Sequence, residues 1–152
     1  MNRLVAFYDR GVEIAASRIP ESLALFLLRV ALAGVFWRSG QTKVIEGSFL
    51  SINPSTYDLF ASEFSGLPLD PVIAVPLTTY AEHFFPVLLL FGLATRFSAG
   101  ALLVMTLVIQ IFVFPDAWWP VHSLWVAMAA ILIVRGGGLF SLDALLARVR
   151  TQ

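Results

Sequence analysis

Two residues of opposite charge, Arg29 and Glu82, stand inside long apolar stretches of the sequence. A charge at the centre of a bilayer costs at least about 2.5 to 3.5 kcal/mol, so we expect the two to pair inside a helix bundle. Arg29 precedes Gly40 by eleven residues. Glu82 follows Pro71 by the same number, which puts both about 16 Å from the outer ends of antiparallel helices. The pair is either a structural clamp between two helices or part of a site in which Glu82, the candidate catalytic residue, exchanges a proton.

Further polar residues lie near the ends of the same apolar stretches. Gln110 is four residues from the end of the third stretch, and Arg38 points to the opposite side of its helix from Arg29. Arg38 either extends to outer headgroups or joins a polar pocket near the outer surface. Such donors suit a quinone carbonyl or an anionic headgroup. The candidate binding residues are Arg29, Arg38, Gln41, Lys43, His83, Gln110 and His122.

The two histidines, His83 and His122, raise the alternatives of haem and metal binding. His83 is expected near mid-membrane, next to Glu82, whereas His122 begins the last apolar stretch at the outer edge. Ligands at such different depths do not suit one haem or one metal ion, so we predict no metal site. No haem, flavin or iron–sulfur site is evident in the sequence.

The elements that must position these residues are four apolar stretches, each long enough to cross a bilayer. They cover residues 22–40, 71–92, 97–114 and 118–134. Hydrophobic residues make up 59% of the 152 residues, charged residues only 13%, and the mean hydropathy is +0.84. We therefore predict a single all-α domain over residues 1–152, an integral membrane four-helix bundle.

Charge and cysteine content exclude several classes of protein. Ten basic and ten acidic residues give a net charge of zero, which argues against nucleic acid as a partner. The absence of cysteine excludes disulfide-generating membrane enzymes and dithiol relays. Any redox chemistry must therefore use a bound carrier or a partner protein.

The segments outside the four stretches also carry patterns. The residues before the first stretch recur at helical spacing and predict an amphipathic helix, and the tail after residue 141 predicts a second, shorter one. A cleaved signal peptide is the competing reading of the first stretch. In the outer loop, residues 41–70, we expect a short helix over 56–64 that covers the end of the bundle. Residues 136–138, three consecutive glycines, predict a flexible helix terminus.

Basic residues predict the orientation. The N-terminal segment, the turn between the second and third stretches and the C-terminal tail all carry arginine, whereas the loop 41–70 has a net charge of −3. Both termini are therefore expected in the cytoplasm, and the protein is expected to be multi-pass.

Three segments, in this order, resemble the DoxX family of small four-helix membrane proteins. They are residues 36–43, residues 82 and 88–96, and residues 136–143. The resemblance marks Gly40, Lys43, Glu82, Gly92, Arg96, Ser141 and Asp143 as motif positions, and so adds Arg96 to the candidate binding residues. It implies a bacterial inner (plasma) membrane protein linked to quinone-dependent oxidoreductase systems.

We expect an integral inner-membrane subunit of a redox system that binds a quinone or a similar lipid-soluble carrier and works with a partner oxidoreductase. As an enzyme it is at most a quinone-linked oxidoreductase subunit. Its expected partners are membrane lipid and a protein of a redox complex. The alternatives are a non-catalytic membrane anchor or assembly scaffold, and a small-molecule exporter that forms a homo-oligomer.

Overall fold

The computed structural model describes residues 3–48 and 50–150, and these are almost entirely helical. Four segments are long and apolar enough to cross a membrane. They are α2 (Arg18–Gln41), α4 (Pro71–Phe91), α5 (Thr95–Phe112) and a composite span from Pro115 to Arg135. The predicted all-α membrane bundle is confirmed, and its four spans overlap the four predicted stretches.

The composite span is irregular in its first two turns. It begins with a 3₁₀ turn, η1 (Pro115–Ala117), continues as a π turn, η2 (Trp118–His122), and becomes the regular helix α6 (Ser123–Arg135). Pro120 has no N–H to donate, and the backbone N–H of Ser123 reaches back five residues to the carbonyl of Trp118. The wide turn places His122 on the inner side of the bundle, where it is 3% exposed.

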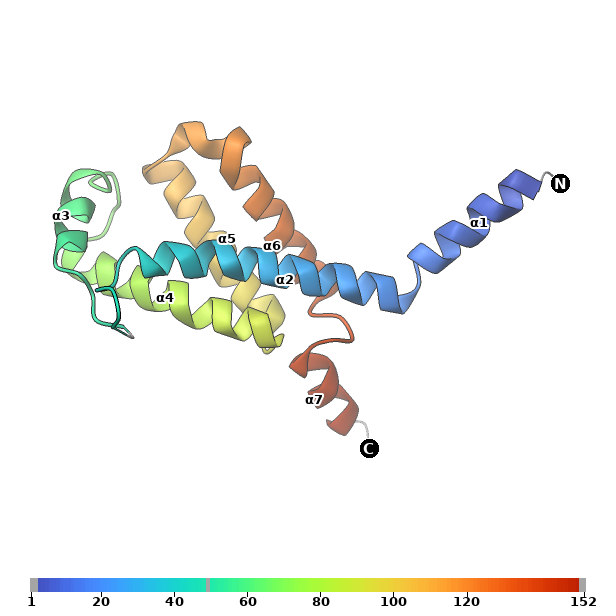
Figure 1. The fold of residues 1–152 in the computed structure, drawn as a ribbon. Coiled ribbons are helices and arrows are strands. Elements are labelled where there is room, and N and C mark those ends of the chain that lie inside the picture. Colours follow the sequence, from blue (N-terminus) through green and yellow to red (C-terminus); the bar gives the residue numbers. More distant parts are fainter. Residues whose placement is uncertain (1–2, 49, 151–152) are drawn as a thin grey trace.

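The spans alternate in direction, so the bundle has two distinct ends (Figure 1). We call the end at which α2 finishes and α4 begins the α3 end. The opposite end, where α4 turns into α5 and α6 finishes, is the α7 end. In Figure 1, α4 continues past the end of α2 to reach α3.

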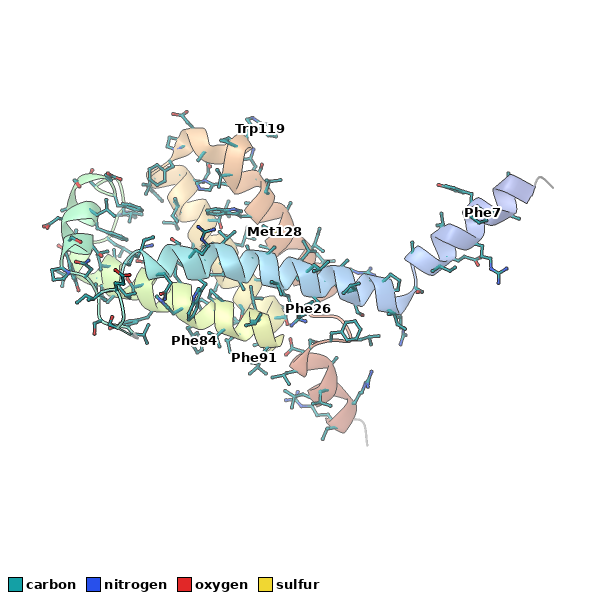
Figure 2. All side chains as sticks on the ribbon, in the orientation of Figure 1. Phe7, Phe26, Phe84, Phe91, Trp119 and Met128 are labelled. Carbon is teal, nitrogen blue, oxygen red and sulfur yellow. The ribbon has the colours of Figure 1, made fainter. Side chains whose placement is uncertain are left out.

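Three shorter helices lie outside the spans: α1 (Arg3–Ala15), α3 (Ser55–Ser62) and α7 (Leu142–Arg150). They agree with the predicted N-terminal helix, loop helix and C-terminal helix. α1 extends away from the bundle and α7 also leaves it at the α7 end (Figure 1). Large apolar side chains on both are exposed, among them Phe7 and Val149, as the amphipathic patterns predicted. Figure 2 shows Phe7 on the isolated helix α1.

One core joins the four spans. Leu32 and Phe36 of α2, Leu89 of α4, Leu102 of α5 and Leu132 of α6 are almost fully buried in it. A second, smaller core forms where Phe60 of α3 packs on Ala74 and Val75 of α4. The second core holds α3 over the part of α4 that extends beyond α2.

Local chemistry explains where α4 begins and ends. Asp70 accepts a hydrogen bond from the backbone N–H of Val72, and Pro71 occupies the first turn, where its missing N–H costs nothing. The helix ends at Gly92, whose φ of +67° lies in the left-handed region that favours glycine. The tight turn that follows brings α5 back against α4.

Candidate functional site

Glu82 forms a buried ion pair with Lys43 near the α3 end. Lys43 Nζ lies 2.6 Å from Glu82 Oε2, and the Ser39 hydroxyl donates to Glu82 Oε1 over 3.2 Å. Lys43 Nζ also donates to the hydroxyl and the carbonyl oxygen of Ser39, at 3.0 and 3.2 Å. Glu82 is 2% and Lys43 7% exposed. Each buried charge thus has its counter-charge and additional hydrogen bonds, which such a pair requires.

The loop after α2 fixes the backbone of Lys43. Its N–H donates to the carbonyl of Gly40 at 3.0 Å. Its carbonyl accepts from the N–H of Asn53 at 2.9 Å and from the Thr56 hydroxyl at 3.1 Å. A single β-bridge between Val44 and Ile52 closes the small hairpin between them. The start of α3 and the end of α2 therefore hold Lys43 against α4 together.

The ion pair lies on the wall of a cavity of about 510 Å³. This volume falls within the range of small-molecule sites, roughly 300–1,000 Å³. Most of the wall is apolar and comes from α2, α3, α4, α5 and α6 together with the loop 63–69. Its polar side chains are Ser39, Lys43, Thr78, Glu82 and His122. An apolar chamber with a few polar groups is typical of a site for a lipophilic ligand.

Aromatic side chains cover the cavity at the α3 end. The rings of Phe60 and Phe64 stack with centroids 4.5 Å apart, and Phe64 meets the ring of Phe114 edge-on at 5.6 Å. Gly66 allows the loop to close, because a side chain there would collide with the carbonyl oxygen of Phe112. The loop that was expected to cover the end of the bundle does so.

On the side of α4 and α5, the same residues form part of the cavity wall and of the lipid-facing surface. Leu77 of α4 and Val104 of α5 line the cavity and are nevertheless 58% and 60% exposed. Both lie within membrane spans, so their exposed surfaces face acyl chains. At these two positions, only a single layer of side chains therefore separates the cavity from the bilayer.

His122 lies on the cavity wall and bonds to Gln110. Its Nδ1 is 2.7 Å from Gln110 Oε1, and Gln110 Nε2 donates to the carbonyl of Pro115 at 2.6 Å. The His122 ring packs 5.1 Å from that of Trp125, which in turn packs on Phe36. Lys43 and His122 thus line one cavity at the α3 end and Gln110 bonds to His122, whereas Arg38 and Gln41, expected in the same polar pocket, do not line it.

His83 faces a different direction from its neighbour Glu82. Its Nδ1 lies 2.7 Å from the carbonyl oxygen of Thr79, its Nε2 lies 2.9 Å from Gln41 Nε2, and the ring packs edge-on against Trp37. His83 and Gln41 do not line the cavity. A Cβ on Gly40 would lie 2.7 Å from the His83 ring, so glycine is needed at this helix contact. These two candidate binding residues therefore form a contact between α2 and α4.

The expected pairing of Arg29 with Glu82 is wrong. Arg29 is fully buried and donates to the carbonyls of Leu89 and Leu90, at 3.1 and 3.3 Å, and to that of Phe140. Its guanidinium carbon also lies 5.3 Å from the centre of the Phe26 ring, and Figure 2 labels Phe26 on α2 near the α7 end. Arg29 closes the C-terminal end of α4 and takes no part in the cavity wall.

The error arises from the offset between the two helices. A Cβ on Gly40 would lie 3.2 Å from Glu82 Cβ, so Glu82 is level with the last turn of α2. Arg29, in contrast, reaches Leu89, which lies seven residues, or about 10 Å, further along α4. Arg29 and Glu82 would share a depth in the membrane only if α4 began level with the end of α2. In fact the first turns of α4 extend beyond α2 and support α3 (Figure 1).

Other charged residues at the α7 end also satisfy helix termini. The Asp143 carboxylate accepts from the backbone N–H groups of Ala94 and Thr95, at 2.7 and 2.8 Å, and so caps α5. Arg96 donates to the last carbonyls of α6. A second depression of about 550 Å³ opens among these groups, but Arg96 and Asp143 are already engaged there. Arg96, a candidate binding residue, therefore caps a helix.

Residues 136–138 are packed closely, in place of the expected flexible terminus. A Cβ on Gly137 would lie 2.7 Å from the side chains of both Ser141 and Thr95, and one on Gly138 would lie 3.1 Å from the α-carbon of Ser22. The turn thereby crosses the ends of α2 and α5.

Ser39 is the site residue that sequence reasoning did not single out. Its position four residues before Lys43, near the end of the first apolar stretch, was the available signal. Arg38, which was singled out, is exposed and does not line the cavity. No group of three metal-ligating side chains occurs within residues 3–48 and 50–150.

Comparison with known proteins gives two matches. The model of the family described as DoxX matches residues 24–115. An uncharacterized protein of Haemophilus influenzae is 31% identical, over 86% of this chain and 88% of its own length. No solved structure matches.

Proposed function

The chain belongs to the DoxX family of membrane proteins, and from this premise we propose that it binds a quinone or a similar lipid-soluble carrier beside Glu82 and works with a partner oxidoreductase. The observation that carries the proposal is the cavity itself. A largely apolar chamber among the membrane spans has a buried ion pair on its wall.

Access favours a ligand that is dissolved in the membrane. The aromatic rings of Phe60, Phe64 and Phe114 pack together over the cavity at the α3 end, whereas Leu77 and Val104 lie between it and the lipid surface. A water-soluble substrate would have to cross the closed end. A carrier that diffuses in the bilayer enters between α4 and α5.

The ion pair supplies the groups that a carrier with ring oxygens needs. Two of the Lys43 hydrogen bonds go to Ser39, at 3.0 and 3.2 Å, and one of them can be exchanged for a ligand oxygen while the contact with Glu82 is kept. Each Glu82 oxygen accepts one described hydrogen bond and has a second lone pair. Oxidation of the reduced carrier breaks two O–H bonds, and Glu82 takes the two protons in turn, releasing the first before it accepts the second. The electrons pass to the partner.

The direct test is carrier binding to purified protein in lipid nanodiscs, with ubiquinone-1 and menadione as probes. We expect both Glu82→Gln and Lys43→Gln to weaken binding at least tenfold, because each breaks the buried pair. Glu63→Gln is the matched control, since Glu63 is an exposed glutamate of the covering loop. Absent binding in the wild type, or equal binding in the wild type and Glu82→Gln, rejects the proposal.

The orientation and location are part of the proposal. We place the α7 end in the cytoplasm and the chain in a bacterial inner membrane, because Arg18, Arg96 and Arg135 lie at the α7 end and the loop at the α3 end is acidic. Reporter fusions after residue 66 and after residue 150 test this. Alkaline phosphatase should be active only at the first position.

A membrane scaffold is the second candidate, and the α7 end favours it. Within the described residues, the hydrogen bonds of Arg29, Arg96 and Asp143 there go to backbone groups, which is what a purely structural role requires. The scaffold predicts that Glu82→Gln keeps its partner proteins and its cellular activity. Copurification from native membrane, comparing wild type with Glu82→Gln, separates the two candidates.

A further inference from the structure

The hydrogen bonds around Gln110 determine which nitrogen of His122 carries its proton. Gln110 Nε2 lies 2.6 Å from the carbonyl oxygen of Pro115, and a carbonyl can only accept, so the NH₂ group of the amide must point to Pro115. The amide oxygen therefore faces His122 Nδ1, at 2.7 Å. Because this oxygen is also only an acceptor, Nδ1 must donate, and it carries the hydrogen of the neutral ring.

This leaves the second ring nitrogen as a lone-pair acceptor. His122 Nε2 has no hydrogen-bond partner within residues 3–48 and 50–150, although the side chain is only 3% exposed. Nε2 is not one of the fully enclosed polar atoms without a partner in the described residues, which are Arg29 Nε, Thr79 Oγ1, Thr95 Oγ1 and Ser98 Oγ, so it is open to a small molecule. His122 lines the same cavity as Lys43 and Glu82, so an occupant of the cavity can supply the missing donor.

We infer that His122 Nε2 accepts a hydrogen bond from a hydroxyl group of the ligand, so that the cavity prefers the reduced, hydroxyl-bearing form of an aromatic carrier over its oxidised form. This inference rests on the proposed function and specifies the ligand state that the site selects.

The two polar parts of the cavity wall, Lys43 and His122, differ in the hydrogen-bonding group that they need from a ligand. Lys43 donates, and a ligand oxygen can accept from its ammonium group whether the carrier is a quinone or a quinol. The lone pair of His122 Nε2 can be satisfied only by a donor. A quinone carries only carbonyl oxygens and would place one acceptor against another, whereas a quinol offers an O–H. Only the reduced form satisfies both parts of the wall.

The test compares duroquinone with tetramethylhydroquinone, two probes that differ by two hydrogens and have nearly the same shape. Binding to the protein in nanodiscs is measured without oxygen. We expect the reduced probe to bind about tenfold more tightly, the equivalent of one hydrogen bond. For a two-electron couple, this ratio raises the midpoint potential of the bound carrier by about 30 mV.

Two variants locate the preference. His122→Leu should bind both probes equally, through a loss of affinity for the reduced form. His83→Leu is the matched control, because His83 is also buried in a span but has both nitrogens engaged and lies outside the cavity wall. It should keep the preference. Equal binding of the two probes to the wild type, or a preference that survives His122→Leu, overturns the inference and leaves carrier binding intact. If neither probe binds to the wild type, the proposed function itself fails.

A ligand-free measurement covers the case in which His122→Leu does not fold. In the wild-type protein labelled with ¹⁵N-histidine, the Nε2 resonance of His122 should show the downfield shift of an unprotonated nitrogen. In Gln110→Leu, which removes the acceptor for Nδ1, the two tautomers should mix. A protonated Nε2 in the wild type overturns the inference.

Discussion

The two ends of the bundle both bury charged side chains, but they use them differently. At the α7 end, Arg29 and Asp143 bind backbone carbonyls and N–H groups at the ends of α4 and α5. At the α3 end, Lys43 and Glu82 bind chiefly each other and Ser39, on the wall of a cavity. Charged side chains are buried at both ends, so burial by itself does not distinguish a ligand-binding site from a structural contact between helices.

The two roles are distinguished by whether the charged side chain bonds to backbone groups or to other side chains. Backbone groups at a helix end are fixed, and a side chain that satisfies them holds the fold together. Side-chain partners on a cavity wall can exchange for ligand atoms without breaking a helix. We therefore expect changes at the α7 end to lower stability alone, and changes at the α3 end to lower ligand binding as well.

The largest effect is expected from Lys43→Met. It leaves the Glu82 carboxylate buried without its counter-charge, which costs about 3 to 5 kcal/mol of unfolding free energy. The double variant Lys43→Met/Glu82→Met removes both charges and should recover most of that loss. Unfolding in mixed micelles measures both. A double variant as unstable as the single would mean that the pair matters to the fold through its packing and not through its charges.

Arg29→Met comes next, with an expected loss of about 3 kcal/mol, because charge-assisted hydrogen bonds to three carbonyls disappear. Arg38→Met is the control, since Arg38 is an exposed arginine of the same helix and should change stability by less than about 0.5 kcal/mol. Affinity for ubiquinone-1 should be unchanged in the folded fraction of both. A stable Arg29→Met that cannot bind would place Arg29 in the site and remove the contrast between the two ends.

This contrast also separates what the sequence could predict from what it could not. Hydropathy and length predicted the four spans, because crossing a bilayer fixes both. Distances from the helix ends placed Lys43, Gln110 and His122 near the same end of the bundle, but they placed Arg38 and Gln41 there too, and these two do not line the cavity. The family resemblance contributed the motif positions, and Asp143 among them proved to be a helix cap.

The sequence could not predict which charged residues of different helices pair with each other. The axial offset of α4 against α2 depends on how the loop 42–70 folds, and counting residues within each helix contains no information about that offset. The direction in which His83 points could not be predicted either. Its ring contacts Gly40, and this contact depends on how α2 and α4 pack against each other. Relative placement of helices therefore limited the prediction of the site.

Asp143→Ala tests the structural role of the α7 end, with a smaller expected loss of stability than Arg29→Met. It removes the carboxylate that caps α5, which costs about 1 to 2 kcal/mol. Asp143→Asn keeps one acceptor oxygen and should lose less. Asp116→Ala, at an exposed aspartate, serves as the control. Carrier binding that falls in proportion to the missing hydrogen bonds, at constant folded fraction, would show that the two ends are coupled.

The smallest effect concerns the entrance to the cavity. Leu77→Trp adds bulk at the surface between α4 and α5, where Leu77 both lines the cavity and faces lipid. Phe84→Trp is the matched control, because Phe84 is equally exposed on the same helix and does not line the cavity (Figure 2). Stability should be unchanged in both, since neither residue is buried in the core. Stopped-flow binding of ubiquinone-1 should slow several-fold in Leu77→Trp alone.

Entry from the bilayer and entry through the covering loop predict opposite results in that experiment. If the carrier came past Phe64, bulk at Leu77 would leave the association rate unchanged, and Phe64→Ala would raise it. If it comes between α4 and α5, Phe64→Ala loosens the cover without speeding entry, because the rate is set at the lipid surface. The two variants therefore decide whether the carrier enters through the α3 end or whether the residues there only cover the cavity. The structural role of the α7 end is the same in both cases.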